Sequence, residues 1–407
     1  MQQRSPASKR RLFIIIALVL AVQAICLCCV SVGFAGEEAS RNHTGATQAT
    51  DKTFENWFSD KVYTATHSRD AWLVDLMTRT GEKPESADSH SLYREAQARG
   101  IVGDYPESEL FAPLTRDFVS FTLCRALHYP DRTPGYLSDV PEDKPYLATA
   151  AYFGYFLPDI NFCVHPDAQI TPAEYEELLT ELDRREMLCG KRVLAFGDSI
   201  MHGSGNGGSG IARMFCEKYG MICVDYSVPG ATMGVAQGRR HIPDQVRSAA
   251  SAKVQADIIL LNGGTNDMFL TKLGAFTRGF DMKNTKEDTY TGGFERVMWM
   301  LKEHWSDVPV VYIRAHNMAL GEAENEIAFG ERGIGIAEKW GASSVDIYNL
   351  SGLDTEDPAQ CSRYTYLNPK HQYICDSIHP NALCYAKFYF PYIAVAVTEE
   401  FSNEVSE

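Results

Sequence analysis

A serine, a histidine and an aspartate in this sequence have the side chains that nucleophilic acyl transfer requires. Ser199 ends a Gly-Asp-Ser turn that follows a short apolar run, and Asp376 precedes His379 by three residues. Serine is a poor nucleophile until a base removes its proton, and histidine is suited to that role near neutral pH. A carboxylate that accepts a hydrogen bond from the imidazole holds it in one tautomer. The three residues are therefore candidates for nucleophile, general base and orienting partner. The alternative is a helix-capping turn and an unrelated surface histidine.

Two further residues could stabilise the negative charge that develops on a substrate carbonyl oxygen. Gly230 lies in the segment Ser-Val-Pro-Gly-Ala, and Asn266 lies in the segment Gly-Gly-Thr-Asn-Asp. A glycine lets the backbone N–H approach a ligand closely, and an asparagine amide is a neutral hydrogen-bond donor. A turn glycine and a helix cap are the alternative interpretations. We predict that both residues belong to an oxyanion-binding site.

These residues follow apolar runs that we expect to be strands of a parallel sheet. From residue 191 onward, short apolar runs alternate with helix-length segments, which is the pattern of βα repeats. The predicted strands are residues 192–196, 222–226, 257–261, 309–313 and 344–348. The predicted crossover helices are residues 214–219, 243–253, 294–304 and 322–340. Because right-handed crossovers place the carboxyl ends of all strands at one edge, Ser199, Gly230 and Asn266 would meet there.

Together, the four segments resemble the blocks of the SGNH (GDSL-type) hydrolase family. The matching blocks are Gly197-Asp198-Ser199 with Gly203, then Gly230, then Gly264-Thr265-Asn266-Asp267, then Asp376-x-x-His379-Pro380. The resemblance implies a flavodoxin-like, three-layer α/β/α domain over residues 190–407, acting as an esterase without a cofactor. It also implies that Ser199 is the nucleophile, His379 the general base and Asp376 its orienting partner. The backbone N–H groups of Ser199 and Gly230, with the side chain of Asn266, would form the oxyanion hole.

The N-terminal 35 residues are typical of an export signal peptide or a membrane anchor. Residues 1–11 carry four basic side chains and no acidic one, and residues 12–36 are uncharged. The small residues Gly33 and Ala35 suit cleavage after Ala35, whereas an uncharged run of 25 residues could also span a bilayer. Residues 36–65 are polar and predict a flexible linker. We expect a secreted or envelope-associated protein on the extracellular face. Its net charge of −15 argues against nucleic acid as a ligand.

Residues 66–185 contain a weak internal repeat of helix starts. A hydroxyl residue suited to capping precedes a helix-like run at three places, Ser68, Thr115 and Thr171. Self-similarity at this spacing indicates stacked copies of one helical unit. The region resembles S-layer homology repeats, which are helical and bind cell-wall polysaccharide. The arginine of that family near the helix start is matched by Arg116 and Arg69, whereas Pro172 stands at the third position. A helical spacer without a ligand is the alternative.

Eight of the eleven cysteines follow the predicted export segment, and an even number outside the cell favours disulfides. Cys361 with Cys375 and Cys216 with Cys223 are the first candidate pairs, although spacing does not establish the connectivity. Neither C-x-x-C nor H-x-x-x-H spacing occurs among these residues, so we expect no metal site.

We therefore expect an exported serine esterase that removes short acyl groups, such as acetyl, from carbohydrate or cell-envelope substrates. A lipase or lysophospholipase, and a non-catalytic cell-wall-binding protein, are the alternatives. We expect Asp198 and Asp267 to support their loops and His316 to be solvated or structural. Residues 268–292 form a segment that is longer than a connection to the next predicted helix requires. We expect this segment to overhang the pocket and to determine which substrate is accepted.

Overall fold

The computed structural model describes residues 67–81, 88–280, 282, 285–319, 323–371 and 374–404. The chain divides between Tyr63 and Thr64, and every described residue lies in the second of the two units. The predicted export segment and the predicted linker, residues 1–35 and 36–65, lie outside the described residues. Within the described ranges, every helix is too short or too polar to span a lipid bilayer.

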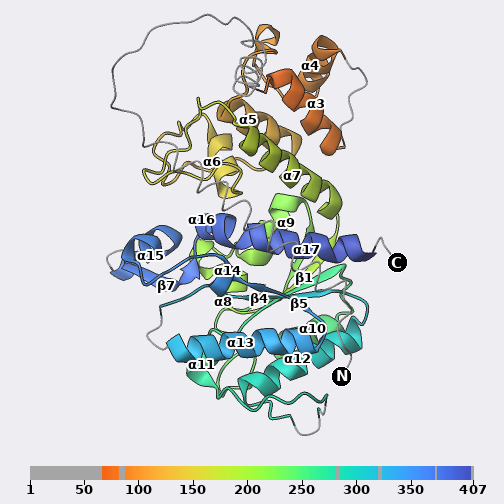
Figure 1. Ribbon diagram of the computed structural model, residues 1–407, viewed down its shortest axis with the longest axis vertical. Helices are drawn as coiled ribbons and strands as arrows, with labels where there is room; N and C mark the ends of the chain where they lie inside the picture. The colour runs from red at the N-terminus through yellow and green to blue at the C-terminus, as the bar shows by residue number, and fades with distance from the viewer. Residues whose placement is uncertain are drawn as a thin grey trace, which may run out of the picture. The chain divides into compact units, whose positions relative to one another are not determined.

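A parallel sheet of five strands forms the centre of the C-terminal half, in the order β2-β1-β3-β4-β5 (Figure 1). The strands are β1 (Arg192–Phe196), β2 (Ile222–Asp225), β3 (Ile258–Asn262), β4 (Val310–Arg314) and β5 (Ser343–Asp346). Each coincides with a predicted strand to within two residues, because most of them are apolar runs that a sheet covered on both faces can bury. This strand order is that of flavodoxin-like sheets.

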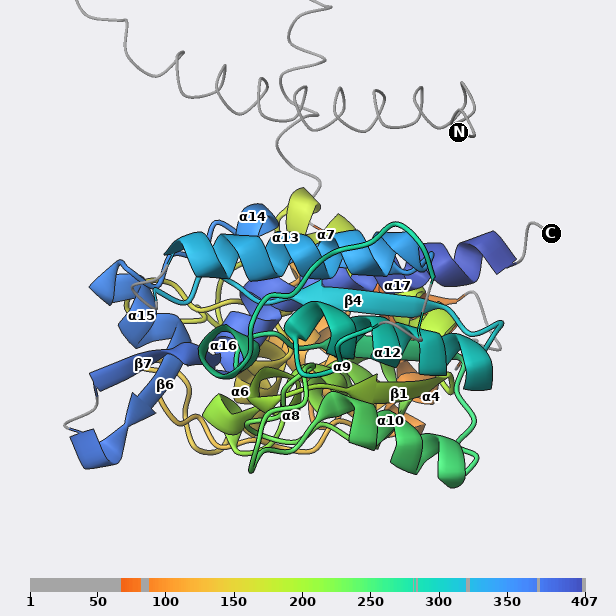
Figure 2. The ribbon, with the colours of Figure 1, turned by 90° about the horizontal axis from the view of Figure 1, so that it is seen from below.

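Helices cover both faces of this sheet. The helices α9 (Ile211–Tyr219) and α17 (Phe390–Glu404) lie on one face. On the other face lie α10 (Ile242–Ser251), α12 (Tyr290–His304) and α13 (Ala323–Lys339) (Figures 1 and 2). Successive strand residues point to opposite faces, so Val193 and Ala195 join the core beneath α9, whereas Leu194 and Phe196 join the core beneath α12. The predicted three-layer α/β/α architecture is confirmed.

Shorter elements carry the residues at the edge of the sheet. They are α8 (Ser199–His202), η2 (Ser204–Asn206), α11 (Asp267–Leu270), α14 (Ile347–Leu350), α15 (Pro358–Tyr364), η4 (Pro369–His371), α16 (Ala382–Cys384) and the π-helical turn η5 (Tyr385–Tyr389). Two more strands, β6 (Thr365–Asn368) and β7 (Ile374–Pro380), pair antiparallel as a separate hairpin. Figure 2 shows this hairpin outside the five-stranded sheet.

The N-terminal half of the described chain is helical. Its helices are α3 (Arg69–Arg79), α4 (Ser89–Ala98), the short η1 (Glu107–Glu109), α5 (Arg116–Ala126), α6 (Pro145–Tyr152) and α7 (Pro172–Leu188). The three predicted helix starts lie at the N-termini of α3, α5 and α7. Short backbone bridges join the chain at these starts, from Ser68 to Pro113 and from Thr115 to Gln169. The three helix starts of the predicted repeat are thus linked to one another in space.

One continuous cluster of buried side chains joins the helical region to the sheet. It extends from Trp72 in α3 through Leu182 in α7 to Phe215 in α9 and Val397 in α17. The helical region therefore packs on the same face of the sheet as α9 and α17.

Candidate active site

Ser199 is the first residue of α8, directly after the turn that ends β1. Gly197 makes this turn possible, because a Cβ there would lie 2.6 Å from Cβ of Met201 and 2.8 Å from the carbonyl oxygen of Asn262. The carboxylate of Asp198 accepts a hydrogen bond from the N–H of Ile200 at 2.9 Å and so caps α8. Burial raises the pKa of Asp198 to about 6. As predicted, Asp198 supports the turn that presents the serine.

His379 lies on β7 and contacts both Ser199 and Asp376. Its Nε2 is 2.9 Å from Oγ of Ser199, and its Nδ1 is 2.7 Å from Oδ2 of Asp376. The other carboxylate oxygen of Asp376 accepts the backbone N–H groups of Ile378 and His379, at 3.1 and 3.0 Å. Burial alone would raise the pKa of Asp376, but the hydrogen bonds from His379 outweigh it and lower the pKa. An ionised Asp376 therefore holds the imidazole with Nε2 facing the serine hydroxyl.

The three segments proposed for the oxyanion hole follow neighbouring strands. Ser199, Gly230 and Asn266 come after β1, β2 and β3, and these strands are adjacent and parallel. Gly230 has a φ of +79°, a conformation that strongly favours glycine. The side-chain amide of Asn266 donates a hydrogen bond to the carbonyl oxygen of Ala231 at 3.0 Å, which ties the loop after β3 to the loop after β2. The structure thus brings these segments to one edge of the sheet.

Asp267 holds the loop after β2 through hydrogen bonds to its backbone. Its two carboxylate oxygens accept the backbone N–H groups of Met233 and Gly234, at 2.8 and 2.9 Å. Burial raises the pKa of Asp267 to about 6. The expectation that Asp267 supports the neighbouring loops agrees with these contacts.

His316 supports the turn between Asp376 and His379. It is fully buried, and its Nε2 lies 3.1 Å from the carbonyl oxygen of Ser377, which can only accept a hydrogen bond. Its Nδ1 therefore accepts from the hydroxyl of Tyr389, at 2.7 Å. Burial lowers the pKa of His316 to about 4, so the ring is neutral at neutral pH. Ser377 has a φ of +56°, a strained conformation for a serine that this hydrogen bond helps to hold. The sequence predicts no such contact, because a single histidine between strands carries no signal of its partner.

A disulfide and an asparagine attach β7 to the neighbouring helix α15. Cys361 of α15 is bonded to Cys375 of β7, which confirms the first predicted pair. The side chain of Asn381 donates to the carbonyl oxygen of Arg363 in α15, at 2.8 Å. The second candidate pair is not formed in this structure, where Cys216 and Cys223 are free thiols. Their side chains contact each other through a hydrogen bond, because α9 packs beside β2, but no covalent bond joins them.

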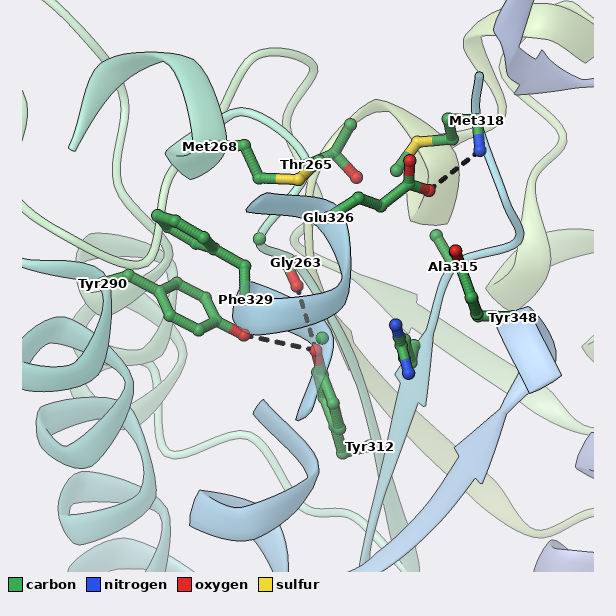
Figure 3. Close-up of a pocket in the computed structure, with 13 residues that line it drawn as sticks. Gly263, Thr265, Met268, Tyr290, Tyr312, Ala315, Met318, Glu326, Phe329 and Tyr348 are labelled. Carbon is green, nitrogen blue, oxygen red and sulfur yellow. Dashed lines mark hydrogen bonds between the residues drawn. The ribbon is translucent and has the colours of Figure 1, made fainter. Parts of the chain in front are cut away.

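A small cavity lies beside the loop that carries Asn266 (Figure 3). Its lining includes Gly264, Met268 of α11, and Glu326 and Phe329 of α13. Its volume is about 30 Å³, which holds about two water molecules. The base of the cavity contains Arg314, which is ion-paired with Asp346 at 3.2 Å. Ser199 and His379 do not line this cavity, which therefore adjoins the oxyanion loop rather than the nucleophile.

Part of the segment after α11, around Phe276 and Phe280, packs along α13 and does not overhang the site as expected. Its aromatic side chains pack along α13: Phe276 contacts Arg332, and Phe280 contacts Trp340 at a ring-centroid distance of 4.8 Å. Trp340 directly follows α13 and precedes β5, so it lies near the edge of the sheet opposite the carboxyl ends of the strands. The aromatic residues are thus used to cover α13, and the expectation that residues 268–292 overhang the pocket is wrong for this part of the segment.

Residues 195–387 match the model of the GDSL-like lipase/acylhydrolase family. Among solved structures, a protein from Lactobacillus plantarum is 20% identical and covers 53% of this chain and 98% of its own, with a TM-score of 0.42. The psychrotrophic esterase EstA from Pseudoalteromonas sp. is 15% identical and covers 52% of this chain and 99% of its own, with a TM-score of 0.35. Est24, a carbohydrate acetylesterase from Sinorhizobium meliloti, is 12% identical and covers 52% of this chain and 99% of its own, with a TM-score of 0.36. No curated protein matches the sequence.

Proposed function

Because residues 195–387 match the model of the GDSL-like lipase/acylhydrolase family, we propose that the protein is a serine hydrolase that cleaves carboxylic esters through an acyl-enzyme at Ser199. The observation that carries this proposal is the chain of two contacts from Ser199 through His379 to Asp376, at 2.9 and 2.7 Å. A serine hydroxyl within hydrogen-bond reach of an imidazole that a carboxylate orients is the arrangement that activates a serine nucleophile.

The reaction proceeds in two displacements. As Oγ of Ser199 bonds to the carbonyl carbon, Nε2 of His379 takes the hydroxyl proton. The N–H groups of Ser199 and Gly230 and the amide of Asn266 stabilise the oxyanion, and each such donor contributes about 3 to 4 kcal/mol in enzymes where one has been removed. The imidazolium then protonates the departing alcohol. A water molecule, deprotonated by His379, attacks the acyl-enzyme, and the acid leaves as Ser199 regains its proton.

The substrate we propose is an ester of a short acid, such as an acetyl group on a carbohydrate or on cell-envelope material. The export-like pattern of residues 1–35 and the resemblance of residues 66–185 to polysaccharide-binding repeats support a substrate of this kind. Rates on p-nitrophenyl esters of two to twelve carbons test this point. We expect the highest kcat/KM with acetate; a preference for long chains would instead indicate a lipase or lysophospholipase.

Labelling with a fluorophosphonate probe tests the nucleophile directly. The wild-type protein should become labelled and the Ser199→Ala variant should not. Ser248→Ala is the matched control, because Ser248 is an exposed serine on α10 whose hydroxyl donates only to a carbonyl oxygen of its own helix, and this variant should be labelled like wild type. Absence of labelling in the folded wild type would reject the esterase.

We also propose that the chain is exported through residues 1–35 and that the helical region contacts cell-wall polysaccharide. The basic and apolar pattern of residues 1–35 and the three repeated helix starts support this proposal. Two of the arginines near those starts, Arg69 and Arg116, are paired with Glu109 and Glu174, each at 2.6 Å. Co-sedimentation of the Ser199→Ala chain with purified cell walls tests binding. Walls stripped of their attached polysaccharide are the control, and equal sedimentation with both would contradict it.

A further inference from the structure

The helical region touches the loop that follows the nucleophile. The hydroxyl of Tyr152, the last residue of α6, donates to Oγ of Ser209 at 3.0 Å and accepts from the side-chain amide of Asn206 at 3.3 Å. Asn206 and Ser209 lie in residues 203–210. This loop directly follows α8, the helix whose first residue is Ser199. The ring of Tyr152 is itself held by the guanidinium of Arg132, 3.6 Å from the ring centre. A side chain of the helical region is thus part of the surroundings of the nucleophile loop.

The same loop packs against the strand that carries the general base. A Cβ built on Gly205 would lie 2.6 Å from the carbonyl oxygens of both His379 and Pro380. The two ends of the loop meet as closely, because a Cβ on Gly203 would lie 2.1 Å from the backbone nitrogen of Gly210. With so little free space, a displacement of residues 203–210 would shift the backbone of His379 relative to Ser199.

A second contact from the helical region reaches the base through α15. The guanidinium of Arg363 donates to the carbonyl oxygens of Pro158, Asp159 and Ile160, at 2.9, 2.5 and 3.2 Å. The carbonyl oxygen of Arg363 in turn accepts from Asn381, two residues after His379. The Cys361–Cys375 disulfide joins the same helix to β7. The helical region therefore holds the base-bearing strand as well as the nucleophile loop.

Charged and polar contacts fix the helical region to α9, the helix after the nucleophile loop. Arg132 contacts both carboxylate oxygens of Glu217 at 2.8 Å, and Lys218 is ion-paired with Glu181 of α7. The Lys218 side chain is only 6% exposed, and separating a buried ion pair leaves costly uncompensated charge. The two parts of the chain are thus held in one arrangement, and Tyr152 and Arg363 have fixed positions relative to the site.

We propose that the helical region is a positioning module for the esterase, which sets the placement of Ser199 relative to His379 through its contacts at Tyr152 and Arg363. This inference rests on the proposed esterase function. The C-terminal half of the chain supplies the proposed nucleophile and general base, and the helical region supplies contacts that hold these two groups at reacting distance. Displacing a catalytic group by about 1 Å can cost about a hundredfold in rate, so contacts of this kind affect turnover more than binding.

A double-mutant cycle on the full chain tests the first contact. Tyr152→Phe keeps the ring and removes the hydroxyl, and Ser209→Ala removes its partner. Each should lower kcat for p-nitrophenyl acetate, and the rate of fluorophosphonate labelling, by about three- to tenfold, with KM within about twofold of wild type. The double variant should be no slower than Tyr152→Phe alone, because the contact that Ser209→Ala removes is already lost in that variant. Tyr175→Phe is the matched control, since it removes a hydroxyl that bonds Asp75 within the helical region, and it should leave kcat unchanged.

Arg363→Lys tests the second contact independently, because the single nitrogen of a lysine cannot replace the two guanidinium nitrogens that reach these carbonyl oxygens from fixed positions. We expect a similar fall in kcat with little change in KM. Hydrogen–deuterium exchange of residues 203–210 in Tyr152→Phe, and of residues 374–381 in Arg363→Lys, should be faster than in wild type. The proposal would be overturned if Tyr152→Phe and Arg363→Lys had the same kcat and exchange rates as Tyr175→Phe. It would also be overturned if the losses in kcat of Tyr152→Phe and Ser209→Ala multiplied in the double variant. If the wild type proved inactive and unlabelled, the esterase function would fail, while the exchange rates would still decide the positioning role.

Discussion

Nε2 of His379 lies 2.9 Å from Oγ of Ser199, although 180 residues separate them in the sequence. The serine stands on the rigid edge of the central sheet, whereas the histidine stands on a hairpin outside that sheet. The distance between the two atoms is therefore set by the groups that hold β7: the Asp376 carboxylate, the buried His316, the disulfide to α15 and the loop of residues 203–210. Changes in these supports should affect the reaction in ways that their contacts predict.

Asp376→Asn should lower kcat by about 10³- to 10⁴-fold while leaving the protein folded. An amide in place of the carboxylate donates to Nδ1 of His379, which turns the ring to the tautomer that cannot accept the serine proton. Steady-state hydrolysis of p-nitrophenyl acetate measures the effect. Asp244→Asn is a matched control, because Asp244 contacts His241 at the same three-residue spacing, at 3.1 Å, on α10. If Asp376→Asn kept more than a tenth of the wild-type rate, Asp376 would not be the orienting group.

His316→Phe should destabilise the fold and change its dependence on pH. The pKa of His316 is about 4 in the folded protein and about 6.5 for an unfolded histidine, so between these values the unfolded state binds more protons. The free energy of unfolding that His316 contributes therefore rises with pH across this window, by about 3 kcal/mol, and is lost again on acidification. The variant lacks this contribution, and it also leaves the carbonyl of Ser377 without its donor, at a cost of about 1 to 3 kcal/mol at neutral pH.

Urea unfolding at pH 4 to 8 measures both effects for His316. The difference in free energy of unfolding between the wild type and His316→Phe should be largest above pH 6.5 and shrink toward pH 4. His316→Gln retains an amide donor and should recover part of the stability at neutral pH but none of the pH dependence. A difference that did not vary with pH would contradict a buried, neutral His316.

Asp198→Asn should stabilise the protein above pH 6. The folded pKa of Asp198 is about 6, above the ordinary value near 4, so the folded state binds more protons between these values and stability falls as pH rises through them. An asparagine removes the buried charge and can still cap α8 through its oxygen. The gain in free energy of unfolding should reach about 2 to 3 kcal/mol at pH 8 and disappear near pH 4.

Asp267→Asn is the informative comparison for Asp198. Its pKa is also about 6, but both of its oxygens accept backbone N–H groups, from Met233 and Gly234. An amide nitrogen would face one of these donors, so this variant should lose stability at every pH. Denaturant unfolding of the two variants at pH 5 and pH 8 distinguishes the gain in stability expected for Asp198→Asn from the loss expected for Asp267→Asn. A loss of stability in Asp198→Asn at pH 8 would show that its charge is compensated.

The position of the reacting residues could be predicted because their sequence neighbours determine it. Ser199 and Asn266 each follow a short apolar run that is typical of a buried strand, and parallel strands with right-handed crossovers bring those ends together. Asp376 and His379 are close in sequence, so their contact needs no long-range information. The contacts of Tyr152, Arg363 and His316 could not be predicted in this way, since each depends on how two distant elements pack. Phe276 and Phe280 indicate that their segment covers apolar surface, but not which surface, and they cover α13.

Gly205→Ala should lower kcat by about tenfold or more, through a clash rather than through backbone strain. The added methyl would lie 2.6 Å from the carbonyl oxygens of His379 and Pro380, and both are backbone atoms that cannot rotate away. The loop or β7 must therefore move, which lengthens the distance from Nε2 of His379 to Oγ of Ser199. Gly335→Ala is the control, because Gly335 lies in α13 with open space around it, and alanine there should stabilise the helix by up to about 1 kcal/mol without affecting kcat. Measured kcat and unfolding midpoints for both variants decide the point: a Gly205→Ala enzyme with wild-type kcat would show that the loop and the base move independently.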